Sequence, residues 1–452
     1  MHRISENGTL AGFIQSFSSI GPMLDIVALF SVIAVYSGPF LPLVMLLSFL
    51  AGYTSILTVR RFAATYSSNG GYYSFAGISL GKTFGIFTAI IYLVYAFLVL
   101  PDISSFVAGF IYSSLSMAVH IPVISEPIIA ISFATIAVLV VSRGFRVSMK
   151  YTIAAGVLEI AAVIGFSALF FSLRSPAIPS ISFTTGSISM IWTGFVFGIL
   201  AFSGSGSSVF ISDNVSKPRK TIPRSLILSY TFSGIMMFAS SMSVLFFLGK
   251  TGFQQYSTTP YFILSYIDGR AGFIVSFLFS VVGTLSAFNL SVAYLNASAN
   301  SFERMRRDAL IPTSFRFSKV RNLFLIMGLF VTVIISGVSY ITTGYFFAFE
   351  TLAGVVSLSY IIVHLVLNAA SVRSYRLLGK NIIVISVLSS IFLLSALLYS
   401  IAGNIQEDPL TDTIMALILS VTVIVTITAS HRKRFMLGIK IEAGSDGRAG
   451  NA

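Results

Sequence analysis

Long apolar stretches recur along nearly the whole chain and are separated by short polar loops. Many reach the roughly 20 residues that a helix needs to cross a hydrocarbon core of about 30 Å. They do not alternate apolar and polar positions as the strands of a membrane barrel do. The pattern predicts an all-α integral membrane protein with 12 transmembrane helices, at 12–36, 41–66, 84–114, 126–142, 150–172, 188–212, 225–248, 270–300, 323–341, 345–368, 381–402 and 411–430.

Composition supports this fold class and excludes several kinds of chemistry. Of the 452 residues 56% are hydrophobic and only 10% are charged, whereas about a quarter of a soluble globular protein is charged. The chain has no cysteine, which excludes disulfides, thiolate metal sites and cysteine nucleophiles. Residues 1–10 lack an apolar core followed by a cleavage site, so no removable signal peptide is expected.

The positive charges predict the orientation of the helices. The chain has 28 Lys and Arg residues and a net charge of +13. With twelve spans, all but Arg174, Lys250 and Arg270 fall on the side that holds both termini. The positive-inside rule makes that side cytoplasmic, which predicts a multi-pass protein of the cell membrane with both termini inside. Because the cations lie in loops between spans and not on one folded basic face, no nucleic-acid partner is expected.

The loops leave no room for a soluble catalytic or ATP-binding domain, and no Gly-rich phosphate loop ends in Lys-Ser or Lys-Thr. Four scattered histidines and few buried acids supply no convergent catalytic set. We therefore expect no enzyme activity, no cofactor and no metal site. A carrier driven by a gradient is favoured, with a channel or membrane sensor as the alternative of another class.

Clusters of small residues interrupt two of the apolar helices, at 16–22 in span 1 and at 202–208 in span 6. Broken helices at corresponding places in two halves of a carrier mark its binding site. The spacing predicts a first five-helix repeat at 12–172 and a second, inverted one at 188–368. The remaining segments are then a cytoplasmic N-terminus at 1–11, peripheral helices at 381–430 and a cytoplasmic basic tail at 431–452. In the alternative interpretation the small residues only let helices pack closely.

Three motifs resemble those of a known family. Residues 213–224 read Asp-Asn-Val-Ser-Lys-Pro-Arg-Lys-Thr-Ile-Pro-Arg and are similar to a loop that enters span 7 in the amino acid–polyamine–organocation superfamily of secondary transporters. Residues 304–312 and the Asn-Gly-Gly-Tyr-Tyr run at 69–73 are similar to two further elements of amino acid permease-like members. The resemblance implies a LeuT-like five-plus-five inverted repeat with discontinuous helices 1 and 6. The chain departs from the family at Ala309, where glycine is usual, and near Gly206, where an acid is often found.

The resemblance also implies a substrate site at the two breaks. Backbone amides of the first break would hold an α-carboxylate, and carbonyls of both breaks would hold an α-ammonium. Phe202 is similar in placement to an aromatic gate, with Leu200 as the neighbouring candidate. The residues expected to bind substrate are Ser18, Ser19, Ile20, Gly21, Phe202, Ser203, Gly204, Ser205 and Gly206.

Three acids lie well inside apolar runs, where an ionised side chain costs about 3 kcal/mol. They are Asp25, Asp102 and Glu159. Glu159 aligns with a position where some sodium-independent relatives carry a lysine, which makes it the candidate for proton coupling; the alternative is a residue that only joins helices. Asp25 is expected to cap the second half of span 1 rather than face the pocket. Asp102 is expected to line an outer vestibule.

The remaining polar residues give weaker expectations. Ser286, Asn289 and Ser291 would form a cation site if sodium is used. Glu350 is expected at the interface and His364 as a hydrogen-bonded neighbour. The sequence thus favours a proton-coupled symporter of amino acids or related amines that works by alternating access in the lipid bilayer, as a monomer or weak dimer. An amino acid/polyamine exchanger and a sodium-coupled symporter stay open.

Overall fold

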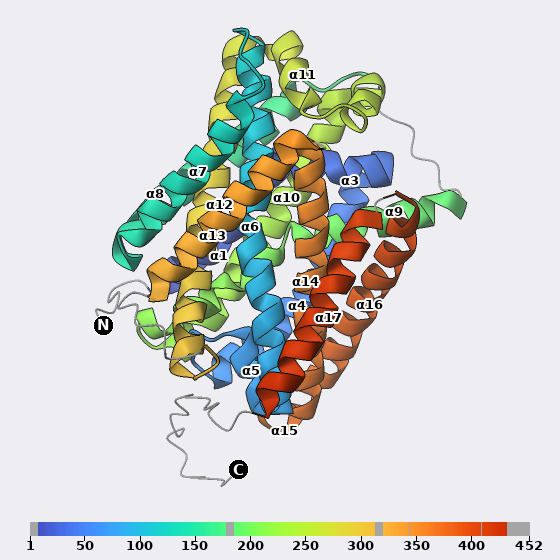
Figure 1. The fold of residues 1–452 in the computed structure, drawn as a ribbon. Helices are drawn as coiled ribbons and strands as arrows, with labels where there is room; N and C mark the ends of the chain where they lie inside the picture. The colour runs from blue at the N-terminus through green and yellow to red at the C-terminus, as the bar shows by residue number, and fades with distance from the viewer. Residues whose placement is uncertain (1–7, 178–184, 312–319, 343, 408, 432–452) are drawn as a thin grey trace.

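The computed structural model describes residues 8–177, 185–311, 320–342, 344–407 and 409–431. The predicted terminal segments, 1–11 and 431–452, lie largely outside the described residues. In the part of the chain that is described, twelve helical stretches are long and apolar enough to cross a membrane. The all-α fold class predicted from the sequence is confirmed, and the helices form one bundle (Figure 1).

The first half of the bundle contains the first five predicted spans. Span 1 is built from three consecutive helical pieces, and a short helix, α5, connects spans 2 and 3. The elements are α1 (Gly8–Ile20), α2 (Pro22–Val27), α3 (Leu29–Ser37), η1 (Gly38–Phe40), α4 (Leu41–Thr65), α5 (Tyr72–Leu80), α6 (Lys82–Ser116), α7 (Ser125–Ser142) and α8 (Phe145–Ser172).

The second half contains spans 6 to 10, and the two last spans follow it. Span 6 consists of α9 and η2, and α11 connects spans 7 and 8. The elements are α9 (Thr185–Leu200), η2 (Ser203–Asn214), α10 (Pro218–Tyr256), α11 (Phe262–Ala271), α12 (Phe273–Arg307), α13 (Val320–Ile341), α14 (Tyr345–Arg373), α15 (Tyr375–Leu378), α16 (Ile382–Glu407) and α17 (Pro409–Ser430). This order is consistent with the predicted five-plus-five inverted repeat.

Both predicted breaks are present, and the local sequence explains each. Gly21 has a φ of 67°, a left-handed conformation that ends α1. Pro22 then opens α2, where its missing N–H costs no intrahelical bond. In span 6 the α-helix ends at Leu200, and the chain resumes at Ser203 as the tighter 3-10 helix η2.

The two breaks lie against each other. A Cβ atom on Gly204 would stand 1.8 Å from the carbonyl oxygen of Ser19, so only glycine permits this approach of backbone to backbone. The Ser207 hydroxyl donates to the carbonyl of Gln15 at 3.0 Å, and the amide of Ser208 donates to Ser16 Oγ at 3.2 Å. The half-helices α1 and η2 are therefore joined by backbone packing and by hydrogen bonds.

The bundle has two distinct ends. The helix α11 lies at one end and the helices α5 and α15 lie at the other, which we name the α11 end and the α5 end (Figure 1). The helices α16 and α17 lie together at the side of the bundle, where they pack on α14. Their outward side chains, such as Leu398 and Ile424, are more than half exposed, as expected for a surface that faces lipid.

Candidate functional site

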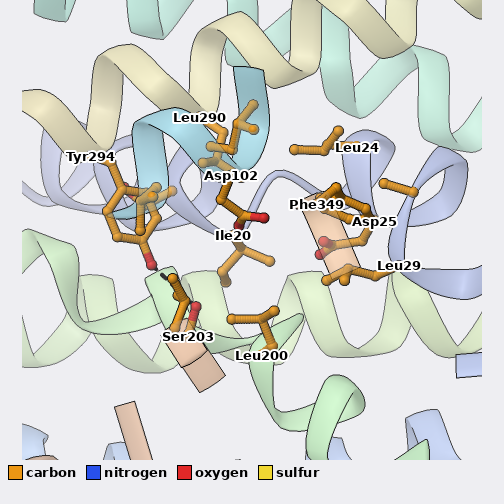
Figure 2. Close-up of a pocket in the computed structure, with 15 residues that line it drawn as sticks. Ile20, Leu24, Asp25, Leu29, Asp102, Leu200, Ser203, Leu290, Tyr294 and Phe349 are labelled. Carbon is orange, nitrogen blue, oxygen red and sulfur yellow. Dashed lines mark hydrogen bonds between the residues drawn. The ribbon is translucent and has the colours of Figure 1, made fainter. Parts of the chain in front are cut away.

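A cavity of about 50 Å³ lies where the two breaks meet. Ser19 and Ile20 from the end of α1 and Ser203 from the start of η2 line it, as the sequence predicted for a substrate site. Helices α6, α12 and α14 complete its walls with Val99, Leu290 and other, mainly apolar, side chains (Figure 2). At this volume the cavity has room for only a few water molecules.

Two aspartates also line this cavity, which differs from the sequence-based expectations. Asp25 was expected to cap the second half of span 1, but the residue before α2 is Gly21 and no side chain caps that helix. Asp102 was expected in an outer vestibule, but it lies opposite Asp25 in the central cavity (Figure 2). The side chains are 3% and 6% exposed, respectively. The cavity is therefore acidic as well as apolar.

Three hydroxyl groups form a cluster at the side of the cavity nearer the α5 end. The Tyr95 hydroxyl donates to Ser203 Oγ at 3.3 Å and is hydrogen-bonded to the Tyr294 hydroxyl. Ser203 Oγ and Tyr294 Oη are 3.2 Å apart. Neither tyrosine was predicted. Tyr95, Val99 and Asp102 follow one another at intervals of four and three residues, so one face of α6 carries all three, and this spacing was the available signal.

The predicted aromatic gate, Phe202, does not line the cavity. Its ring packs at 5.2 Å from the ring of Tyr230 and at 6.1 Å from that of Phe49. Leu200, the neighbouring candidate, lines the cavity instead. Leu200 is the last residue of α9, whereas Phe202 lies in the break before η2, so the two side chains take different directions.

Glu159 lies beside the first break, in a separate cluster on α8. It is 2% exposed, and its two carboxylate oxygens accept hydrogen bonds from three donors. Oε1 accepts the Ser286 hydroxyl at 2.5 Å and the amide of Met23 at 3.3 Å. Oε2 accepts Asn289 Nδ2 at 3.1 Å, and this nitrogen also donates to Ser18 Oγ at 2.9 Å. Three residues predicted separately, Glu159, Ser286 and Asn289, are thus brought together.

The backbone amides at the first break are already engaged. The Gly21 amide donates to the carbonyl of Phe17 at 3.1 Å, and Pro22 has no amide hydrogen. The Met23 amide donates to Glu159, and the Leu24 amide donates to Ser286 Oγ at 3.0 Å. The resemblance assigns backbone amides of the first break to a substrate carboxylate, and in this structure the protein's own oxygens accept the hydrogen bonds of these three amides.

Other predicted residues take structural positions. Ser291 donates to the carbonyl of Ala287 in its own helix at 2.9 Å and does not join the Glu159 cluster. Gly206 packs on Tyr72, whose hydroxyl oxygen would stand 1.8 Å from an added Cβ. Ser205 is buried in η2. Glu350 accepts a hydrogen bond from the Tyr36 hydroxyl at 2.9 Å, and His364 Nδ1 lies 2.5 Å from Ser55 Oγ.

The three sequence motifs meet at the α5 end. Asn69, from the 69–73 motif, donates to Asn214 Oδ1 at 3.3 Å and accepts the amide of Asp213 at 2.8 Å. Arg304 lies 3.7 Å from Asp213 and 3.2 Å from Asp308. The Tyr73 hydroxyl donates to Asp308 Oδ2 at 2.9 Å. A polar network therefore joins α5, η2 and α12 and closes this end of the bundle.

Comparisons with known proteins agree with this geometry. The sequence model of a family described as amino acid permease matches residues 9–377. A solved structure described as MhsT in complex with L-phenylalanine superposes with a TM-score of 0.60 and 15% identity. The match covers 88% of this chain and 99% of that chain, and it shows a shared fold. Among curated proteins, no sequence matches this chain.

Proposed function

Because the chain belongs to the amino acid permease family, we propose that it moves amino acids or related amines across the cell membrane by alternating access, coupled to protons through Glu159. It is a multi-pass membrane transporter, not an enzyme, and its substrate is a small molecule. The observation that carries the proposal is the position of Glu159, whose hydrogen bonds connect α8 and α12 to the first break at the edge of the central cavity.

Alternating access would use the two five-helix units, 12–172 and 188–368, with 381–430 at the periphery. The cations support the orientation, because only Arg174, Lys250 and Arg270 fall outside the loops at the α5 end and at the termini. The α5 end and both termini would then be cytoplasmic, and the protein would work as a monomer or weak dimer. The chain has no cysteine, so single cysteines at 146 and 268 test this: a membrane-impermeant thiol reagent should label only the second in intact cells.

The donors around Glu159 argue against a sodium ion at this carboxylate, which leaves the proton as the coupling ion that we propose. A sodium ion needs several oxygen atoms directed at one point. Here Met23, Ser286 and Asn289 all present hydrogen-bond donors to the carboxylate. A carboxylate that exchanges a proton breaks and re-forms such bonds. Protonation of Glu159 would therefore change the contacts of the first break, because Met23 lies in the first turn of α2.

Transport in proteoliposomes tests the coupling. We expect the native protein to accumulate substrate when the outside is made acidic, and Glu159→Gln to lose this accumulation while it retains counterflow exchange. Glu126→Gln at the start of α7, outside the cluster, is the matched control and should behave as the native protein does. Unchanged pH dependence in Glu159→Gln would refute the role of Glu159.

The same assay separates the alternatives. Stimulation by sodium at constant pH would support a sodium-coupled symporter, and strict dependence on internal substrate would support an exchanger. Conductance that rises without saturation as substrate increases would indicate a channel and would contradict the proposal.

A further inference from the structure

Two carboxyl groups face the central cavity, and each has one buried oxygen without a hydrogen-bond donor among the described residues. Asp25 comes from α2 and Asp102 from α6, next to the helix-internal Pro101. Figure 2 shows both side chains directed into the cavity. In the part of the chain that the structure describes, Asp25 Oδ2 and Asp102 Oδ1 are buried and accept no hydrogen bond.

Among the described residues, no basic side chain lines the cavity beside these two acids. None of the ion pairs among the described residues involves Asp25 or Asp102. A buried charge without a partner is destabilising, and apolar walls strengthen its attraction to a cation that enters. Ile20, Leu24 and Leu290 provide such walls.

The cavity offers a substrate carboxylate much less. The amides of Gly21, Met23 and Leu24 donate to Phe17, Glu159 and Ser286, so they are not available to a ligand as the structure stands. A carboxylate placed between Asp25 and Asp102 would also meet two acidic groups, and it would be repelled by either one in its ionised form. The cavity therefore offers carboxyl oxygens without donors but no available backbone amide, and this combination favours a positively charged substrate.

We infer that the substrate is an organic cation that carries ammonium groups and needs no carboxylate, and that Asp25 and Asp102 are its specificity-determining residues. The hydroxyl groups of Tyr95, Tyr294 and Ser203 add oxygen acceptors at one side of the cavity. An aliphatic diamine is the simplest compound of this class, with one ammonium for each carboxylate. This inference rests on the proposed transport function and narrows its substrate.

Thermal unfolding of the purified full-length protein tests the inference with three probes of similar length: 1,4-diaminobutane, 1-aminobutane and L-leucine. A ligand that binds only the folded state raises the unfolding temperature by an amount that grows with the logarithm of its concentration over its Kd. We expect the diamine to raise it most, the monoamine less and leucine not at all. A larger shift with leucine than with the diamine would overturn the inference.

Variants then assign the selectivity to the two acids. Asp25→Asn and Asp102→Asn should each weaken diamine binding about 10- to 100-fold, the range expected for a hydrogen bond to a charged group. Each should also bring the diamine affinity close to that of the monoamine, an effect that a merely structural role would not produce. Asp412→Asn on the peripheral helix α17 is the matched control and should preserve the preference.

Counterflow separates this inference from the proposed function. Exchange of labelled diamine that leucine does not inhibit supports both. Exchange of leucine without exchange of diamine overturns the inference and leaves transport standing. If neither amines nor amino acids exchange, both fail. Should an Asn variant not fold, Asp25→Glu and Asp102→Glu, which keep the charge, must retain diamine binding, and loss of binding in both would contradict the assignment.

Discussion

Two buried acidic sites lie on either side of the same short helix, α2, and they differ in how their charges are met. Glu159 accepts hydrogen bonds from Met23, Ser286 and Asn289. Asp25, two residues after Met23, and Asp102 each keep a buried oxygen without a donor among the described residues. Burial is nearly complete in both sites. The difference teaches that the supply of hydrogen-bond partners, and not burial, distinguishes the site proposed for proton coupling from the site proposed for a ligand.

A substitution that separates the two breaks should abolish both sites and have the largest effect. Gly204→Ala places a Cβ 1.8 Å from the carbonyl oxygen of Ser19, so α1 and η2 must move apart. We expect loss of transport and an unfolding temperature lowered by more than 10 °C in fluorescence-detected thermal scans, about the effect of several kcal/mol. Gly165→Ala in α8, where an added Cβ meets nothing within 4 Å, is the control and should be neutral.

Neutralising both aspartates should remove binding but not stability. In the double variant Asp25→Asn, Asp102→Asn, diamine binding measured by scintillation proximity should fall more than about 100-fold, since two charged contacts are lost. The ligand-free protein should unfold at the same temperature or higher, because two unpartnered buried carboxyl groups are gone. A fall in the stability of the ligand-free protein would show that these acids have internal partners after all.

Neutralising Glu159 should have the opposite effect: it should lower the stability of the protein and leave ligand binding nearly unchanged. Glu159→Gln replaces hydrogen bonds to a carboxylate with weaker ones, so the free energy of unfolding should fall by about 1–3 kcal/mol. Diamine affinity should change less than threefold, because Glu159 does not line the central cavity. Equal loss of affinity in the Glu159 and Asp25 variants would mean that the two sites are one.

Two serines on α12 provide the smallest effects and the closest control. Ser286→Ala removes a donor to Glu159 and the acceptor for the Leu24 amide, and should cost about 1–2 kcal/mol of stability. Ser291→Ala removes only a bond to its own helix and should stay within about 0.5 kcal/mol of the native protein. Both are measured by thermal scans, and a larger effect at Ser291 would contradict the placement of these residues.

The sequence predicted the features that depend on local pattern. Span lengths follow from hydropathy, and the breaks at Gly21 and near Ser203 follow from residues that cannot continue an apolar helix. The grouping of Glu159 with Ser286 and Asn289 was not stated as one cluster, because their helices lie more than 120 residues apart in the chain. Contact between distant helices depends on packing that one sequence does not reveal.

The errors came from the direction in which side chains point. Phe202 and Leu200 differ by two positions, and the end of α9 decides which one faces the cavity. Asp25 was assigned to capping because it follows a proline, yet its place in the first turn of α2 directs it to the cavity. Helix ends are uncertain by a residue or two in any sequence-based interpretation. An error of that size is enough to move a side chain from the core to a binding site.

Because α1 and η2 are joined, they would have to move together in the transport cycle that we propose. Since Gly204 rests on the Ser19 carbonyl and Ser207 and Ser208 bond to α1, neither half-helix can swing away alone without breaking three contacts. In the transport cycle that we propose, the two half-helices would move together as one rigid unit. The chain has no cysteine, so a single disulfide can be introduced between positions 16 and 208. This cross-link would join α1 to η2 without preventing their common movement, and turnover should therefore survive it.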